Sequence, residues 1–322
     1  NYGQLGDGGS NTDISTPPST AINLGSGRTA VAVSTGSFIT CAILDDGELK
    51  CWGKDDGGSL GDGGATNTDT NAPSSTPIDL GTGRTAIAVS ASVGHVCAIL
   101  DNGELKCWGG NTYGKLGVGY GVSSLKQPST TAIDLGTGRT AVAVSAGESN
   151  TCAILDNGSL KCWGWDYYGQ LGDGATNTQE RVSPSPPIDL GTGRTAVAVG
   201  VGQDHVCAIL DNGSVKCWGK GSSGQLGNGG YTDTDSPSST AIDLGTGRTA
   251  VALSVGHLHT CAILDDGSLK CWGYNYQGQL GDGTTTSRLS PVAVSGSNTW
   301  DSSTGLSSGS GGGMTNVTGA TC

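Results

Sequence analysis

The sequence is poor in large apolar residues. Only 34% of its 322 residues are hydrophobic, Phe and Met occur once each, and glycine contributes 58 residues. A thick aromatic core is therefore excluded, and any core must consist of Ala, Val, Ile and Leu. Low apolar content can also indicate disorder, but disordered chains rarely keep Trp, Cys and Ile at one strict, long period. We therefore expect a folded chain.

Basic runs, long apolar stretches and histidines are also scarce. The formal net charge is −12, and no run of Lys or Arg forms a stripe for a polyanion, so we expect no binding to nucleic acid. No stretch reaches the roughly 18 apolar residues of a transmembrane helix, so we expect no membrane insertion. The four histidines stand in no recognisable arrangement with a nucleophile and a carboxylate. We therefore expect neither enzymatic activity nor a cofactor.

What the sequence does contain is a repeat. A Gly-Arg-Thr motif recurs at steps of 54 to 56 residues, with its arginines at Arg28, Arg84, Arg139, Arg194 and Arg248. A Leu-Gly pair after a turn occurs six times, from Leu5 to Leu280. The period predicts six units within a single domain of residues 1–322, with approximate bounds 1–53, 54–109, 110–164, 165–219, 220–273 and 274–322.

Short β-branched runs bounded by glycine, such as residues 141–144, favour strands over helices. About four short strands per unit at this period indicate an all-β fold, a β-propeller of six or seven four-stranded antiparallel blades. A solenoid is the alternative, but its periods are usually shorter or helical.

Each of five units contains a cysteine hairpin of the type TCAILDDGSLKCWG (residues 260–273). Its glycine stands where a three-residue hairpin loop requires positive φ. With residues 45–47 as the loop, Cys41 faces Cys51, whereas a two-residue turn would oppose Cys41 to Trp52. We prefer the first register because all copies then pair their cysteines: Cys41 with Cys51, Cys97 with Cys107, Cys152 with Cys162, Cys207 with Cys217, and Cys261 with Cys271.

Such disulfides would compensate for a thin core, at roughly 3 kcal/mol each in the chain-entropy model. They also predict an oxidising location: extracellular, secreted or on the cell surface. Cys322 is left over. Because Asn1 stands where the residue after a Cys-Trp-Gly is expected and Cys322 where a first hairpin cysteine is expected, we expect a segment of a longer chain. A disulfide from Cys322 to another subunit is the alternative.

The stretch ALSVGHLHTCAILDDGSLKCWGYNYQGQLGDG (residues 252–283) resembles the RCC1 repeat, since it combines a His-containing strand, Trp-Gly and Gly-Gln-Leu-Gly in one period. The resemblance implies a β-propeller, usually of seven blades with four antiparallel strands each. The family includes a guanine-nucleotide exchange factor, ubiquitin-ligase modules, a plant ultraviolet sensor and an inhibitor of β-lactamases, so it selects no single function. The cysteine pair departs from the intracellular members, which argues against nucleotide exchange.

A zinc site is the alternative interpretation of the hairpin, because His95, His205 and His259 each stand two residues before a cysteine. The same column holds Ile39, Asn150 and Ala320 in other copies. We therefore expect histidines bonded to a neighbouring strand and no metal. Acidic loops such as LGDGGSNTD lack the EF-hand glutamate, which leaves calcium open. The Gly-Arg turns have no P-loop ending, and we expect their arginines to pair with the Asp of Ile-Asp-Leu, as Arg84 with Asp79.

Aromatic residues that break the repeat are the candidate partner-binding residues. They occupy equivalent turns, which we expect on one rim of the disc: Tyr113, Trp165, Tyr167, Tyr168, Tyr274 and Tyr276. Clusters of this kind in loops are typical of recognition surfaces, but they can also simply cover the ends of the blades.

Three Asn-x-Ser/Thr triplets are candidate N-glycan sites. Asn157 and Asn212 stand at a hairpin turn, where turn chemistry already explains them, so Asn316 is the better candidate. The loops before Ile-Asp-Leu are rich in Ser, Thr and Pro and could carry O-glycans or contact partners.

These observations favour a non-enzymatic extracellular propeller that acts as a structural or adhesive component of an assembly. The alternative is a soluble protein-binding module, of the inhibitor or receptor type, that uses the rim aromatics. An exchange factor is the third hypothesis. The expected partner is accordingly another protein or further copies of the chain.

Overall fold

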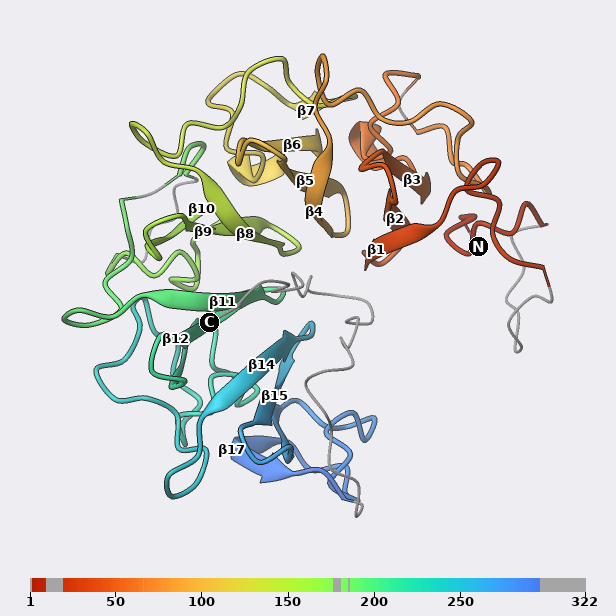
Figure 1. The fold of residues 1–322 in the computed structure, drawn as a ribbon. Coiled ribbons are helices and arrows are strands. Elements are labelled where there is room, and N and C mark those ends of the chain that lie inside the picture. Colours follow the sequence, from red (N-terminus) through yellow and green to blue (C-terminus); the bar gives the residue numbers. More distant parts are fainter. Residues whose placement is uncertain (1, 10–19, 66, 176–180, 185, 296–322) are drawn as a thin grey trace.

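In the computed structural model, residues 2–9, 20–65, 67–175, 181–184 and 186–295 are described. They form five antiparallel sheets that are arranged like blades around a common centre (Figure 1). The first blade contains β1 (Ala30–Thr35), β2 (Ile39–Leu44) and β3 (Leu49–Gly53); the second contains β4 (Ala86–Ala91), β5 (His95–Leu100), β6 (Leu105–Gly110) and β7 (Ser124–Leu125). The third contains β8 (Ala141–Ala146), β9 (Asn150–Leu155) and β10 (Leu160–Gly164); the fourth contains β11 (Ala196–Val201), β12 (His205–Leu210) and β13 (Val215–Gly219); the fifth contains β14 (Ala250–Val255), β15 (His259–Leu264), β16 (Leu269–Gly273) and β17 (Arg288–Ala293). The predicted all-β propeller is confirmed.

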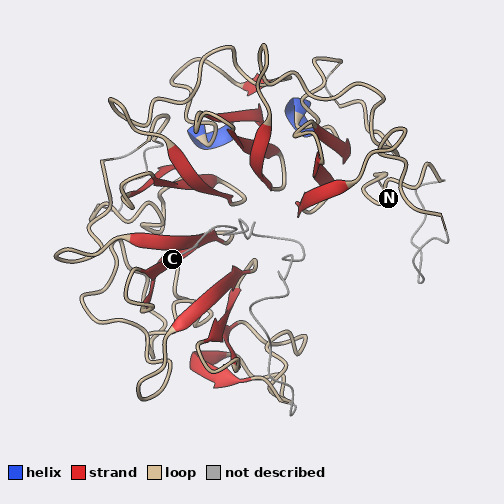
Figure 2. Ribbon diagram, viewed as in Figure 1, coloured by secondary structure: helices blue, strands red, loops and turns tan. Residues whose placement is uncertain are grey.

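The expected fourth, outer strand is missing or short in four of the five described blades. Only the second and fifth blades have a fourth strand in the described residues. In the other three, single bridges take its place: Gly53 with Thr70, Gly164 with Arg181, and Gly219 with Thr234. The segment that passes there is rich in Gly, Ser, Thr, Asp and Pro, which do not sustain a ladder. Two 3-10 helices, η1 (Asp56–Gly58) and η2 (Thr112–Gly114), are the helical segments of the described chain (Figure 2).

The hairpin register predicted for the cysteines is confirmed. Cys41 lies opposite Cys51 in the β2–β3 ladder, and their Cα atoms are 4.1 Å apart. Gly47 ends the three-residue loop with φ of 80°, and a Cβ atom there would lie 2.5 Å from the Cβ of Thr85. All five blades carry the same disulfide.

The hydrophobic core lies between neighbouring blades. Ile39 and Ile43 of the first blade pack with Val89, Val96 and Ala98 of the second, and the arrangement recurs around the described blades. Because each interface uses one face of one sheet and the opposite face of the next, small Ala, Val and Ile side chains suffice to fill it.

The Gly-Gln-Leu-Gly motif is explained by the tryptophan of the Cys-Trp-Gly motif. Trp108 Nε1 donates a hydrogen bond to the carbonyl of Ser59 at 3.0 Å, while Leu60 is buried. A Cβ atom on Gly61 would lie only 2.4 Å from that Nε1 atom, and Gly61 has φ of 73°. The motif therefore packs against a tryptophan in the following repeat.

The ion-pair partner of the arginine in the repeated Gly-Arg turn differs from the prediction. Arg84 pairs with Asp101 at 3.3 Å, in the β5–β6 hairpin turn, and not with Asp79. Asp79 instead accepts a hydrogen bond from Gly81 N at 2.8 Å, which shapes its own turn. Asn23 makes the same bond to Gly25 N at 3.0 Å in the first copy, which explains why Asn can replace Asp there.

Candidate binding surface on one face of the propeller

The ends of the blades form two faces of different chemistry. At one end, the loops between the first and second strands lie beside the turns that follow the third strands: Trp165 N bonds to Ser149 O, and Lys220 N to Asp204 O, both at 2.9 Å. We call this end the aromatic face (residues 36–38, 54–58, 92–94, 110–114, 147–149, 165–169, 202–204, 220–224, 256–258 and 274–278). The other end carries the hairpin turns and the Gly-Arg turns, and we call it the arginine face (residues 25–28, 45–47 and their equivalents in each blade).

Four of the six candidate aromatic residues lie in one cluster on the aromatic face. The ring centroids of Tyr113 and Trp165 are 3.9 Å apart, those of Trp165 and Tyr167 are 5.9 Å apart with nearly parallel planes, and Tyr168 packs edge-on against Tyr167 at 4.9 Å. Tyr113 follows the second blade and the other three follow the third. The cluster therefore crosses a blade boundary.

The remaining candidates form a separate pair between β16 and β17 of the fifth blade, where the ring centroids of Tyr274 and Tyr276 are 4.8 Å apart. A second aromatic pair was not predicted from the sequence. Tyr2 packs edge-on against Phe38 at 5.0 Å, and Lys54 lies within 5.5 Å of both ring centroids. Tyr2 occupies the same repeat position as Tyr113, so comparison of the copies could have found it.

A cation is fixed beside the cluster. Lys220 Nζ lies 4.4 Å from the centroid of Tyr168 and 3.2 Å from Asp204 Oδ2. Burial by itself lowers the pKa of Lys220, but the hydrogen bond and the charge of Asp204 outweigh it, so the pKa is raised. The ammonium group therefore stays charged and extends the surface onto the fourth blade.

Tyr113 has an unusual backbone conformation. Its φ is 65°, a left-handed region that glycine prefers, and the equivalent residue in the turn after β3 is Gly57 with φ of 64°. A bulky residue in this region costs on the order of 1–2 kcal/mol. The stacking of Tyr113 on Trp165 opposes this strain.

Exposure distinguishes the aromatic residues. Tyr167 is 52% exposed and Tyr276 66%, whereas Tyr113, Trp165 and Tyr168 are half-buried. Trp165 thus forms the support of the cluster, and Tyr167 is its most accessible ring.

Ionisable groups from three blades lie near the cluster. His257 Nε2 is 3.4 Å from Glu148 Oε2, and Lys115 Nζ donates to the carbonyl of Glu148 at 3.1 Å. Burial lowers the pKa of Lys115. No group of three metal-ligating side chains is found among the described residues.

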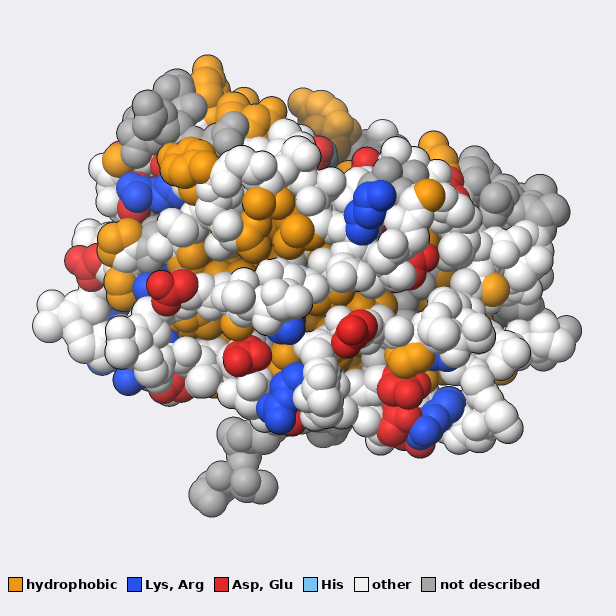
Figure 3. All heavy atoms as spheres, turned by 90° about the horizontal axis from the view of Figure 1, so that it is seen from above, with side chains coloured by type: hydrophobic (Ala, Val, Ile, Leu, Met, Phe, Trp, Pro, Cys, Tyr) orange, Lys and Arg blue, Asp and Glu red, His pale blue; other side chains and the backbone are white. Residues whose placement is uncertain are grey.

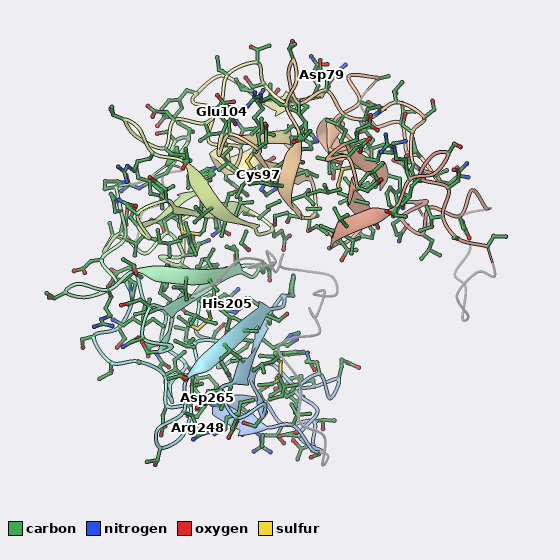
Figure 4. The ribbon with its side chains drawn as sticks, in the orientation of Figure 1. Asp79, Cys97, Glu104, His205, Arg248 and Asp265 are labelled. Atoms are coloured by element: carbon green, nitrogen blue, oxygen red, sulfur yellow. A yellow bond between two sulfur atoms is a disulfide. The ribbon has the colours of Figure 1, made fainter. Side chains whose placement is uncertain are left out.

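The arginine face carries one arginine ion pair in each described blade. Each arginine pairs with an aspartate of its own hairpin turn: Arg28 with Asp45, Arg84 with Asp101, Arg139 with Asp156, Arg194 with Asp211, and Arg248 with Asp265. Figure 4 shows the last of these pairs side by side. Acidic and basic side chains are also interspersed on the side of the molecule drawn in Figure 3. This arrangement does not resemble a polyanion-binding stripe.

The comparison with protein families identifies the fold family. The RCC1-like domain matches residues 1–317 of this sequence. The chain belongs to the RCC1-like domain family. The predicted resemblance is thereby confirmed, and the disulfide in each described blade makes this chain a stapled form of the RCC1-like propeller.

Relatives of this RCC1-like chain have diverse roles. The human E3 ubiquitin-protein ligase HERC2 is 31% identical over 266 residues, which cover 83% of this chain and 5% of HERC2. The ultraviolet-B receptor UVR8 of Arabidopsis thaliana is 32% identical over 294 residues, covering 91% of this chain and 63% of UVR8. The chain thus spans less than two thirds of these relatives.

Solved structures show the same propeller. Human WBSCR16 superposes with a TM-score of 0.73 at 20% identity, covering 84% of this chain and 68% of WBSCR16. Prp20p of Saccharomyces cerevisiae, a protein that binds Gsp1p and histones, superposes with a TM-score of 0.70 at 15% identity, covering 86% of this chain and 65% of Prp20p. These likenesses concern the fold.

Two further candidate residues, Asn316 and Cys322, lie outside the described residues. Asn157 and Asn212 lie exposed in hairpin turns of the arginine face. No helix among the described residues is long and apolar enough to cross a membrane.

Proposed function

We propose that this RCC1-like propeller is a non-enzymatic protein-binding module that acts outside the cytosol and holds its partner on the aromatic face. The observation that carries the proposal is the cluster of Tyr113, Trp165 and Tyr167, which joins two blades and leaves Tyr167 about half exposed. Tyrosine and tryptophan offer large contact areas at a low entropic cost, and they dominate the energetics of many interfaces.

The rigidity of the surface supports this proposal. Trp165 and Lys220 are each anchored through their backbone amides to the loop of the same blade, and Lys220 is held between Tyr168 and Asp204. A surface whose side chains are already ordered loses little conformational entropy when a partner binds. A cation next to exposed rings also suits a polypeptide, which offers carbonyls, carboxylates and apolar side chains together.

The proposed location rests on the disulfides. Five cross-strand cystines in a chain of this size are typical of secreted or surface proteins and rare in the cytosol. Alkylation of the protein under native, non-reducing conditions tests this part. Protection of all ten hairpin cysteines in material from the natural source supports the location, and ten reactive thiols would refute it.

The binding surface is tested by comparing two exposed tyrosines. Tyr167 lies in the cluster, and Tyr231 is 61% exposed outside the residues that define the aromatic face. Partners cross-linked to the wild-type protein in its native medium are identified by mass spectrometry, and their affinities for the variants are measured. We expect Tyr167→Ala to weaken binding at least tenfold and Tyr231→Ala to leave it unchanged. Equal affinities of the two variants would place the partner elsewhere.

A second candidate function is self-assembly into an extracellular structure. It is supported by the five closely similar blades, each held by its own disulfide, which suit a rigid building unit. Electron microscopy and sedimentation of the purified protein test this function. Ordered polymers would support it, and discrete single particles would refute it.

A further inference from the structure

Two hairpin turns of the arginine face present an exposed asparagine whose side-chain oxygen is hydrogen-bonded and whose amide nitrogen, among the described residues, is not. Asn157 Oδ1 accepts hydrogen bonds from Ser159 N at 3.1 Å and from Ser159 Oγ at 2.7 Å. Asn212 makes the same two bonds to Ser214 at the same distances. Both asparagines are exposed, and their Nδ2 amides donate no hydrogen bond within the described residues. Each amide nitrogen is therefore accessible, while its side chain is held by the serine two residues later.

These asparagines also differ from their equivalents in the ion pairs. In the first and fifth blades an aspartate stands at this position and pairs with the arginine of the turn, as Asp266 does with Arg248 at 3.0 Å. In the third and fourth blades the arginine pairs with the preceding aspartate, as Arg139 does with Asp156 at 3.2 Å. A substituent on Nδ2 of Asn157 or Asn212 would therefore break no ion pair and no hydrogen bond.

We propose that Asn157 and Asn212 are N-glycosylation sites, which also revises the preference that sequence reasoning gave to Asn316. Both begin an Asn-Gly-Ser triplet. The co-reactant is a lipid-pyrophosphate-linked oligosaccharide. A bond forms between Nδ2 and the first carbon of the sugar, and the bond from that carbon to the pyrophosphate oxygen breaks. The lipid pyrophosphate leaves, and the proton lost by the amide passes through a base of the modifying enzyme to solvent. The inference rests on the proposed extracytosolic location.

The position of the two sites has a consequence for binding. They lie on adjacent blades, at the β9–β10 and β12–β13 turns, on the end opposite the aromatic cluster. Glycans there would cover part of the arginine face and leave the aromatic face as the accessible broad surface. The second blade provides an internal control, because Asn102 lies in the same exposed turn but is followed by Gly103 and Glu104, which is not an acceptor triplet.

The test uses residues 1–322 secreted from a eukaryotic cell line, with site occupancy measured by peptide mass spectrometry after enzymatic deglycosylation in ¹⁸O-labelled water. We expect a glycan at Asn157 and at Asn212 and none at Asn102. Ser159→Ala should lose only the glycan at Asn157, and Ser214→Ala only the glycan at Asn212. In Glu104→Ser, Asn102 becomes an acceptor, and we expect it to be occupied as well. Secreted, disulfide-bonded protein with unmodified Asn157 and Asn212 would overturn the proposal.

Two further measurements keep this inference separate from the proposed function. The first is the occupancy of Asn157 in the double variant Cys152→Ser/Cys162→Ser, which lacks the disulfide of this hairpin. If Asn157 is modified only in this variant, the native hairpin excludes the modifying enzyme, and the proposal is also overturned. Partner affinity is then measured before and after deglycosylation. If the affinity is unchanged after the glycans are removed, the binding proposal stands. It also stands if no glycans are found but binding still depends on Tyr167.

Discussion

His95 and Thr151, which are 56 residues apart in the sequence, join the second and third blades through a buried hydrogen bond of 2.9 Å. Thr151 Oγ1 donates its own proton to the carbonyl of Lys115 at 2.8 Å, so its oxygen must accept the proton of His95 Nε2. His95 Nε2 therefore carries a proton. His95 Nδ1 is buried and has no hydrogen-bond partner among the described residues, which favours the neutral ring with Nδ1 unprotonated. His205 and Thr260 repeat the bond at 3.0 Å between the fourth and fifth blades, and the expectation of histidines bonded to a neighbouring strand is confirmed for both.

The same comparison identifies a blade interface that lacks this bond. The equivalent pair between the third and fourth blades is Asn150 and Val206. Asn150 is completely buried, and neither its Oδ1 nor its Nδ2 atom has a partner among the described residues. We expect the double variant Asn150→His/Val206→Thr to raise the free energy of unfolding by about 1–3 kcal/mol, because it supplies the missing hydrogen bond and removes an unsatisfied buried amide.

Denaturant unfolding of the two single variants is the control for this prediction. Asn150→His alone lacks an acceptor, and Val206→Thr alone lacks the imidazole, so neither is expected to stabilise the protein as the pair does. Additive effects of the two changes would show that the His–Thr bond does not form at this interface.

The neutral histidines predict a loss of stability in weak acid. Burial, with a smaller contribution from Lys115, holds the pKa of His95 well below its usual value. Burial, with smaller contributions from His259 and His257, lowers the pKa of His205 to about 3. Between pH of about 6.5 and about 3 His205 binds more protons in the unfolded state than in the native state, so stability falls as the pH falls through this window, by ~1.4 kcal/mol per pH unit. His95 adds a loss of stability of the same sign below a pH of about 6.5.

Urea midpoints measured from pH 7.5 to pH 4.5 check this pH dependence. The variant His205→Leu/Thr260→Val, which removes one imidazole together with its partner, should show a shallower decline than the wild type. His257→Gln serves as the comparison, because it removes an exposed imidazole and only a smaller contribution to the pKa shift of His205, so most of the decline should remain. A wild-type midpoint that stays constant over this range would contradict the buried neutral state.

The sequence was sufficient to predict the backbone register of the hairpins but not the side-chain contacts between distant segments. The turn chemistry around Gly47 was sufficient to predict that Cys41 faces Cys51, because a hairpin loop determines its own register. The partner of Arg84 was predicted wrongly, since Asp79 can satisfy a local turn amide two residues away and Asp101 is brought near by folding. Contacts across blades depend on two repeats at once, so a single copy of the motif does not contain them.

The aromatic cluster shows the same limit. The six aromatic candidates were predicted to share one rim, but only the distance of 3.9 Å between Tyr113 and Trp165 shows which blades they connect. The weak outer strands were also not predicted, because a single bridge such as that between Gly53 and Thr70 has no periodic pattern in the sequence.

Glycine positions next to the tryptophans should be intolerant of a methyl group. Gly61→Ala would place Cβ 2.4 Å from Trp108 Nε1 and would also strain a residue with φ of 73°. Gly83 has a similar φ of 69°, but nothing lies within 4 Å of the corresponding Cβ position. We expect Gly83→Ala to cost about 1 kcal/mol and Gly61→Ala at least ~3 kcal/mol, since the second change adds a steric clash to the backbone strain. Equal losses in thermal unfolding would refute the packing role assigned to the motif.

Tyr113 allows the packing and recognition roles of the aromatic cluster to be separated. Tyr113→Gly relieves the strain of a φ of 65° while it removes the ring that stacks on Trp165. Because these effects oppose each other at roughly 1 kcal/mol each, we expect a change in the free energy of unfolding smaller than about 1 kcal/mol. Partner affinity should nevertheless fall severalfold, since Trp165 loses its support.

Tyr113→Ala is the matched control, because alanine removes the ring but retains the strained backbone. It should lower the affinity as much as Tyr113→Gly and should be less stable than that variant by about 1 kcal/mol. If both variants bind the partner as the wild type does while their stabilities differ as expected, the cluster covers the ends of the blades and does not recognise a partner. Loss of affinity in both, with the stability of Tyr113→Gly preserved, assigns the tyrosine to binding, because a residue kept only for packing would not weaken a complex without weakening the fold.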